Sequence, residues 1–193
     1  MARLRHMSVS EYRDRILSAP QLRLVGGIDE AMYAEFRNQL AAAPTDGDLV
    51  VSLTTLGGNP EIARAMADDV RLLREAGRSV LFLGKAAVYS AGATFMAGFP
   101  VHCRFLTKGT RLMIHERQIT RTINLSGPLR SCTDQLKAAL HEIEHSIEIE
   151  EEGFHSLVDE SDIDFETLRE KAPDNWYIPC DEAQEKKLIA GVI

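Results

Sequence analysis

The chain has 193 residues, of which 45% are hydrophobic and 26% are charged, and its formal net charge is −7. These values are typical of a globular protein with one core, so we expect a single domain over residues 1–193. An acidic chain has no bulk electrostatic attraction to nucleic acid. Neither nucleic acid nor a membrane is therefore an expected partner.

The N-terminal segment 1–15 is basic but contains no apolar stretch, so we expect no secretory signal. Cys103, Cys132 and Cys180 are odd in number, widely spaced and without the neighbours of a metal site. We expect them to be reduced thiols of a cytoplasmic protein. We also expect no metal and no other cofactor.

The first half of the chain alternates between short apolar runs and segments with helical spacing. The predicted elements are strands over 21–25, 48–55 and 79–83, and helices with the apolar stripes Met32–Phe36–Leu40 and Ile62–Met66–Val70–Leu73. Asn59 and Pro60 suit the cap and the first position of the second helix. The apolar stretch 80–101 is interrupted by Lys85 and Pro100, which favours a strand, a turn and a helix over a membrane span. This alternation predicts an α/β domain with helices packed on a largely parallel sheet.

The pattern changes after His115. Residues 118–125 alternate between larger apolar or basic side chains and polar ones, which predicts a strand. A long helix follows, with Leu136, Leu140, Ile143 and Ile147 on one face. Such a stripe suits a helix that projects and packs against a second copy of the chain.

Ser90 and His115 are the first candidates for chemistry, because each lies where an apolar strand is predicted to end. A serine at the start of a helix is close to unpaired backbone N–H groups, and a histidine at a strand end can act as its general base. Val88 occupies the position of the first glycine in a G-x-S-x-G motif, which disfavours an α/β-hydrolase. Taken singly, such a serine is more often a helix cap and such a histidine a structural residue. The pair together predicts a hydrolase.

A pair of glycines could complete such a site. The segment TLGG (residues 55–58) lies between a buried strand and the helix capped by Asn59. Glycines there allow a sharp turn that presents backbone N–H groups to a ligand. The N–H groups of Gly58 and Ala91 are the candidate oxyanion donors.

Several segments resemble ClpP, the proteolytic-subunit family of Clp protease. RFLTKGTRLMIH (104–115) is similar to the run that ends in the family's catalytic histidine, TLGG to its S-P-G-G, and GKAAVYSAGA to its G-Q-A-A-S-M-G-A. YIPCDEA (177–183) resembles the family's F-L-S-A-P-E-A, and the order of the segments agrees. The resemblance spans residue 21 to the C-terminus. It implies a ClpP/crotonase-like superhelix of β-β-α units, with a projecting strand and long helix, the handle, over about 117–157.

The resemblance also implies a serine peptidase that cleaves peptides or unfolded proteins through an acyl-enzyme, within a homo-oligomeric ring. Ser90 would be the nucleophile, His115 the general base and acid, and Gly58 and Ala91 the oxyanion donors. The family's orienting aspartate falls on Asn175. An asparagine can fix the tautomer of the imidazole but cannot balance an imidazolium charge. Asp174 is adjacent and is the alternative orienting residue.

The chain departs from the family pattern in three further places. Two additional residues lie between Ala87 and Ser90, and ERQITRTINLSGP replaces the glycine-rich strand after the histidine. The extended C-terminal tail of the family is missing, so docking to an unfolding ATPase stays open. Peptide binding by strand addition along 118–125 is still expected to be available.

Three alternatives stay open at the level of the sequence. The first is a non-catalytic ring subunit or binding protein in which the altered triad is idle. The second is an acyl-CoA enzyme of the crotonase type, which would use the same paired amides on a thioester oxygen. The third is a zinc peptidase, because His141 to His145 satisfies H-E-x-x-H on a predicted helix.

Overall fold

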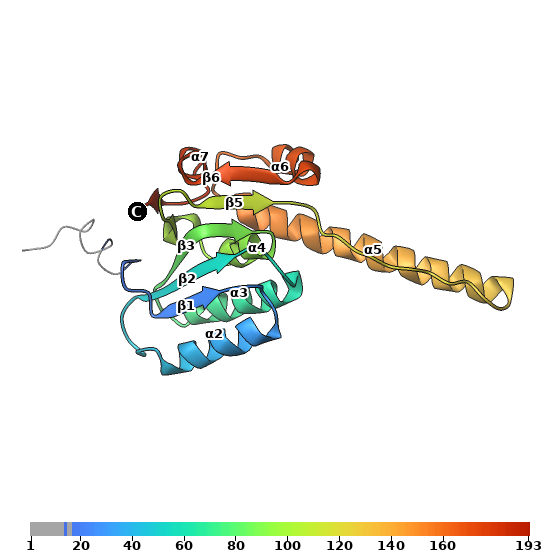
Figure 1. The fold of residues 1–193 in the computed structure, drawn as a ribbon, viewed down its shortest axis with the longest axis horizontal. Helices are drawn as coiled ribbons and strands as arrows, with labels where there is room; N and C mark the ends of the chain where they lie inside the picture. The colour runs from blue at the N-terminus through green and yellow to red at the C-terminus, as the bar shows by residue number, and fades with distance from the viewer. Residues whose placement is uncertain (1–13, 15–16) are drawn as a thin grey trace, which may run out of the picture.

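A seven-stranded mixed sheet forms the body of the protein in the computed structural model, which describes residue 14 and residues 17–193 (Figure 1). Nearly all of the basic N-terminal segment lies outside these described residues. The predicted α/β class is confirmed. The prediction of one domain over residues 1–193 with a handle over about 117–157 stays a prediction.

The strands are arranged so that one long strand, β3, has neighbours on both sides. The parallel part of the sheet has the order β1 (Leu22–Val25), β2 (Leu49–Thr55), β3 (Val80–Tyr89), β4 (Arg104–Leu106) and β7 (Gly191–Val192). β5 (Arg111–Ile114) pairs in parallel with the end of β3, and β6 (Trp176–Pro179) pairs antiparallel with β5. The carboxyl ends of β3 and β5 therefore lie side by side.

The helices cover the sheet and extend beyond it. They are α2 (Glu30–Ala42), α3 (Pro60–Glu75), α4 (Ala91–Ala97), α5 (Leu129–Val158), α6 (Phe165–Lys171) and α7 (Cys180–Glu185). Asn59 caps α3 as predicted, and its side chain accepts hydrogen bonds from the N–H groups of Glu61 and Ile62. Phe95 of α4 makes edge contacts with Phe36 of α2 and Phe82 of β3, so the main core lies between the sheet and these helices.

β3 is longer than the predicted strand because a bulge lets it continue to Tyr89. Leu53 of β2 pairs with Gly84 and Thr55 pairs with Val88, so β3 has three residues between these pairs where β2 has one. Ala86 in this bulge has φ +60°, which is uncommon for a residue with a side chain. The bulge lies before Val88 and Tyr89, which pair regularly with β5, and Ser90 follows the strand directly.

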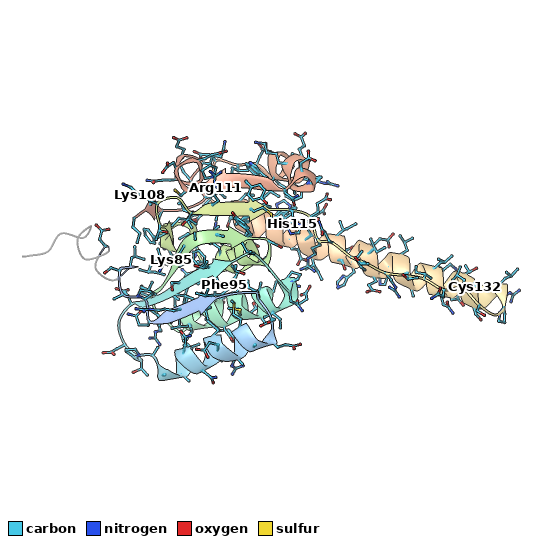
Figure 2. The ribbon with its side chains drawn as sticks, in the orientation of Figure 1. Lys85, Phe95, Lys108, Arg111, His115 and Cys132 are labelled. Carbon is cyan, nitrogen blue, oxygen red and sulfur yellow. The ribbon has the colours of Figure 1, made fainter. Side chains whose placement is uncertain are left out.

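α5 projects from the sheet, with His115 near its base and Cys132 at its far end (Figure 2). Residues 115–126 run alongside it, and Arg121 forms an ion pair with Glu142 of α5 (Figure 1). The structure corrects one expectation here: no strand forms over 118–125, because no neighbouring strand among the described residues offers it ladder hydrogen bonds. No helix in the described part of the chain is long and apolar enough to cross a membrane.

Arg104 is a buried cation that ties distant elements together. It is 2% exposed, and its guanidinium donates to the carbonyl oxygens of Phe99 at 2.6 Å and Leu157 at 2.8 Å. Longer bonds reach the carbonyls of Ala97, Ser156 and Leu188. Burial lowers its pKa to about 10, so the side chain stays protonated at neutral pH. Arg104 thereby neutralises the carbonyl ends of both α4 and α5, the helices that flank Ser90.

Replacing this cation should destabilise the whole fold. We expect Arg104→Met to lower the free energy of unfolding by about 3 kcal/mol, since several buried carbonyls lose a charged donor. The exposed Arg111 of β5 is the matched control, and Arg111→Met should change stability by no more than about 0.5 kcal/mol. Urea unfolding of the three proteins measures both values. Equal stabilities of the two variants would contradict the anchoring role of Arg104.

Candidate active site

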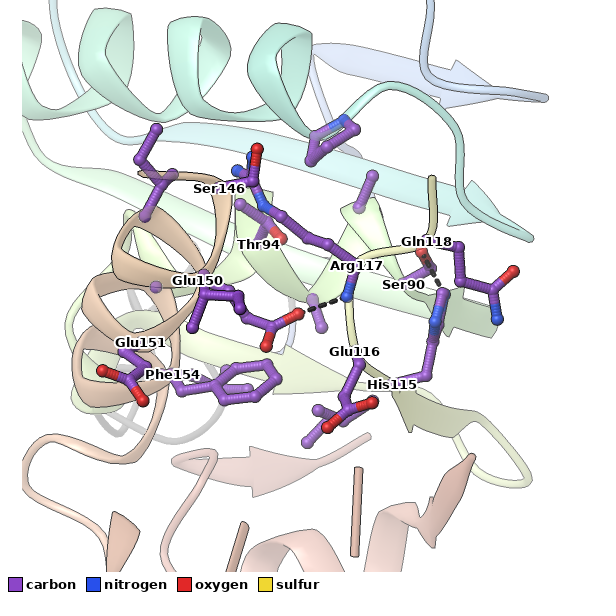
Figure 3. A pocket seen from close by; sticks show the side chains of 18 of the residues that line it. Ser90, Thr94, His115, Glu116, Arg117, Gln118, Ser146, Glu150, Glu151 and Phe154 are labelled. Atoms are coloured by element: carbon purple, nitrogen blue, oxygen red, sulfur yellow. Dashed lines mark hydrogen bonds between the residues drawn. The ribbon is translucent and has the colours of Figure 1, made fainter. Parts of the chain in front are cut away.

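Ser90 and His115 meet at the carboxyl ends of β3 and β5. Tyr89 pairs with Met113 in the parallel ladder, so the residues that follow these strands are brought together. The Oγ atom of Ser90 lies 2.7 Å from Nε2 of His115, at hydrogen-bonding distance (Figure 3). The predicted contact between a serine and a histidine is present in the structure.

The backbone of Ser90 has a conformation that a residue with a side chain rarely adopts. Its φ is +54° and its ψ is −118°, at a sharp turn from β3 into α4. The N–H of Ser90 donates to the carbonyl of Met113 at 2.8 Å, which ties this turn to the strand that carries His115. The Ser90 side chain makes no capping bond to α4. The hydrogen bond to Met113 thus holds Ser90 in a strained backbone conformation, and strain of this kind is typical of functional sites. Because its side chain contacts His115 and not the start of α4, Ser90 is not a simple helix cap.

Gly58 lines the same cavity as this pair and lies in a turn that is hydrogen-bonded to Ile28. The N–H of Ile28 donates to the carbonyl of Gly57 at 2.9 Å, and the N–H of Asn59 donates to the carbonyl of Ile28 at 2.7 Å. Because the neighbours of Gly58 take the bonds to Ile28, its own N–H lies on the opposite side of the chain. A Cβ at Gly58 would overlap the backbone of Ile28, and its φ is +148°. Glycine is therefore required where the sequence predicts an oxyanion donor.

The second ring nitrogen of His115, Nδ1, has no hydrogen-bond partner in the part of the chain that the structure describes. This nitrogen is also buried. The antiparallel pair Ile114–Trp176 places Asn175 opposite His115 in the register. Asn175 is exposed with φ +55°, and neither it nor Asp174 hydrogen-bonds His115. Their role as orienting residues therefore stays a prediction.

Ser90, His115, Gly58 and Ala91 line one cavity of about 690 Å³, a volume typical of small-ligand pockets. Its apolar walls come mainly from β5, α4 and α5, and its charged lining consists of Arg64, Glu116, Arg117, Glu150, Glu151 and Arg169. Figure 3 shows Ser90 and His115 on one side of the cavity and the acidic side chains of α5 on the other. The four candidate residues therefore share a space that could hold a substrate.

Arg117 connects three walls of this cavity. Its Nη1 lies 2.6 Å from Oε1 of Glu61 at the start of α3, and its backbone N–H donates to the carboxylate of Glu150 on α5 (Figure 3). Burial alone would raise the pKa of Glu61, but hydrogen bonds and charges from Arg117 and Arg64 outweigh it and hold that pKa below its usual value. Burial raises the pKa of Glu150, and the hydrogen bond from Arg117 only partly opposes this.

The sequence interpretation missed both Arg117 and Glu150. Arg117 lies in the segment that replaces the family's glycine-rich strand, and its charge at that position was a usable signal. Glu150 belongs to an acidic run that reads as a solvated helix face. Glu150 is partly buried because the segment that contains Arg117 packs against α5, and helical periodicity does not reveal this contact.

The alternative zinc site is not supported by the surroundings of its histidines. His141, Glu142 and His145 are exposed on α5, and His145 lies 3.4 Å from Glu148. Within the described residues, no three His, Cys, Asp or Glu side chains are grouped so that they could hold a metal ion. The described residues thus do not complete a metal site around this pair of histidines.

Comparisons with known proteins agree with this arrangement. The family model described as Clp protease matches residues 5–193. The fold is similar to that of a solved structure, an asparagine-to-aspartate mutant of ClpP1 from Listeria monocytogenes, with a TM-score of 0.71 and 17% sequence identity. The match covers 94% of this chain and 95% of that one. At this identity it shows the fold alone. No curated protein matches the chain.

The contact between Gly57 and Ser90 gives a test of how closely the serine is positioned. A Cβ added at Gly57 would lie 2.8 Å from Cβ of Ser90, whereas one added at Gly26 meets nothing within 4 Å. Both glycines have positive φ, so both alanine variants carry backbone strain but only Gly57→Ala pushes on Ser90. We expect Gly57→Ala to slow modification of Ser90 by a fluorophosphonate about 100-fold, the cost of a displacement near 1 Å.

The Gly26→Ala variant should react with the fluorophosphonate as the wild type does, and melting curves of both variants monitor folding. A folded Gly57→Ala protein that reacts at the wild-type rate would contradict the close positioning of Ser90.

Proposed function

Because the chain belongs to the Clp protease family of serine peptidases, we propose that it hydrolyses peptide bonds through an acyl-enzyme on Ser90. The observation that carries the proposal is the 2.7 Å contact between Ser90 Oγ and His115 Nε2. Both residues line a cavity that also contains Gly58 and Ala91. These are the parts that acyl transfer requires: a nucleophile, a base and two amide donors.

In the proposed reaction, His115 Nε2 accepts the proton of Ser90 as Oγ bonds to the carbonyl carbon of the peptide. The N–H groups of Gly58 and Ala91 donate to the oxygen that becomes negative. The C–N bond then breaks, and His115 gives its proton to the leaving amine. A water molecule next attacks the ester and gives a proton to His115, which returns it to Ser90 as the carboxylic acid leaves.

This sequence requires His115 to carry its resting proton on Nδ1, and we propose that Asn175 stabilises that tautomer. The β5–β6 register supports this role, because it places Asn175 across from His115. In this proposal, the side-chain oxygen of Asn175 accepts a hydrogen bond from Nδ1–H. The imidazolium that forms during turnover would still lack a counter-charge, so we expect slower chemistry than with an aspartate.

A second candidate is a ring subunit that keeps the fold with little or no activity. It is favoured by His115 Nδ1, which has no hydrogen-bond partner among the described residues, since an imidazole without an orienting group is a poorer base. The two candidates differ in whether Ser90 is repeatedly acylated and released by hydrolysis, and the rate of substrate hydrolysis measures this directly.

We also propose that the protein acts on peptides or unfolded proteins as a homo-oligomeric ring. The support is an apolar surface on α5 and the segment beside it, formed by Ile119, Ile123, Leu125, Leu136, Leu140, Ile143 and Ile147, all 39–56% exposed. A surface of this kind is typically covered by another subunit. A cytoplasmic location and docking to an ATPase stay predictions.

Hydrolysis of an activated peptide ester tests the proposed function. We expect wild-type protein to release product in a burst followed by slower turnover, because the acyl-enzyme forms faster than it is hydrolysed. Ser90→Ala should reduce the rate by about 1000-fold or more. Equal rates for the wild type and Ser90→Ala would show that the activity does not use this serine.

Supplying a carboxylate beside His115 should accelerate the reaction. We expect Asn175→Asp to raise the rate of peptide hydrolysis at neutral pH by about tenfold or more, because an aspartate stabilises the imidazolium. Asp tolerates positive φ as Asn does, so the backbone can be kept. Asp174→Asn serves as the control. A rate that falls in Asp174→Asn and does not change in Asn175→Asp would assign the orienting role to Asp174.

The ring proposal makes a prediction about size in solution. We expect Leu140→Glu, which places a charge in the apolar surface, to dissociate the assembly, and sedimentation velocity would record the smaller species. Lys137→Glu changes an exposed residue on the same helix and should leave the assembly intact. A monomeric wild type would contradict the proposal.

A further inference from the structure

The cations that line the cavity are already paired with carboxylates. Arg64 and Arg117 both form ion pairs with Glu61, at 2.9 Å and 2.6 Å. Arg169 lies 3.7 Å from Glu151. None of these arginines forms an ion pair with Glu150, although the charge of Arg117 acts on it over a longer distance and lowers its pKa.

Among the described residues, Glu116 and Glu150 are the two carboxylates of the cavity lining without an ion pair, and of these two only Glu150 is partly buried. It forms no ion pair with any Lys, Arg or His in the described part of the chain, and its Oε2 accepts only the backbone N–H of Arg117. Its other oxygen, Oε1, accepts no hydrogen bond from these residues. The side chain is partly buried, and burial together with the nearby charges of Glu116 and Glu151 raises its pKa. A negative charge that is partly desolvated and unpaired favours a cation that comes from outside.

The position of Glu150 suits recognition of a substrate side chain. It lines the same cavity as Ser90, and Figure 3 shows its carboxylate extending from α5 toward the segment that follows His115. Ile114, Phe154 and Leu157 add apolar surface to the same cavity. A long side chain with an apolar stem and a charged end can pack its stem on such a wall while its end reaches the carboxylate.

We propose that Glu150 is a specificity-determining residue that selects lysine or arginine at the residue whose carbonyl Ser90 attacks; this inference rests on the proposed function. The cation of the substrate pairs with Oε1, while the N–H of Arg117 keeps the carboxylate in place through Oε2. An apolar side chain of the same length fits the wall but leaves the charge of Glu150 uncompensated. The preference therefore comes from the charge and not from the size of the cavity.

Binding to the Ser90→Ala protein tests this selection without requiring turnover. The probes are two dye-labelled hexapeptides that differ only in ending with lysine amide or norleucine amide, and fluorescence anisotropy gives their affinities. We expect the lysine peptide to bind about tenfold more tightly, as a charge-assisted contact predicts. Glu150→Gln, which keeps an acceptor for the N–H of Arg117, should abolish the difference.

The matched control is Glu148→Gln, which removes a charge from an exposed position of α5 outside the cavity lining and should keep the preference. Equal affinities, a preference for norleucine, a preference that survives Glu150→Gln, or no binding of either peptide would each overturn the inference. Ser90-dependent ester hydrolysis together with equal affinities would refute the role of Glu150 alone. A lysine preference that depends on Glu150, in a protein without such hydrolysis, would refute the proposed function alone.

Discussion

The pairing of β3 with β5 is the constraint on which the candidate site depends. Parallel strands bring the residues after their carboxyl ends to one edge of a sheet, and the pair Tyr89–Met113 does this for Ser90 and His115. The N–H of Ser90 then donates to the carbonyl of Met113, which holds the strained turn against the strand of the histidine. The bulge in β3 lies upstream of this pair and leaves the pairing of Val88 and Tyr89 with β5 regular.

Charged side chains hold the segment after His115 against the other elements that line the cavity. Arg117 joins α3 through Glu61 and α5 through Glu150, so the segment after His115 is held by side-chain contacts and not by a ladder. The backbone N–H of Arg117, which strand addition would offer to a substrate, is already used by Glu150. A peptide would therefore meet a carboxylate at this point of the cavity.

The parts of the site that depend on short segments could be predicted from the sequence. Ser90 and His115 each follow a clear apolar run, and Asn59 caps α3 where an asparagine before a proline predicts it. Gly58 could be predicted because a turn between a strand and a capped helix requires positive φ. In each case, the residues next to the predicted position determine its local conformation.

The features that could not be predicted depend on contacts between distant segments. The strand expected over 118–125 has the right alternation, but a strand also needs a partner, and the described chain supplies none. In the sequence, Arg104 cannot be distinguished from a surface cation. In the fold, carbonyl groups at the ends of α4 and α5 surround its guanidinium. Likewise, His115 Nδ1 has no hydrogen-bond partner among the described residues, and neither the sequence pattern nor the β5–β6 register reveals this.

Intact-mass measurement after incubation with a fluorophosphonate tests whether His115 activates Ser90. We expect one adduct per wild-type chain, located by peptide mapping at Ser90, and no adduct in Ser90→Ala. The absence of an adduct in folded wild-type protein, or the same adduct in Ser90→Ala, would contradict the activation of Ser90 by His115.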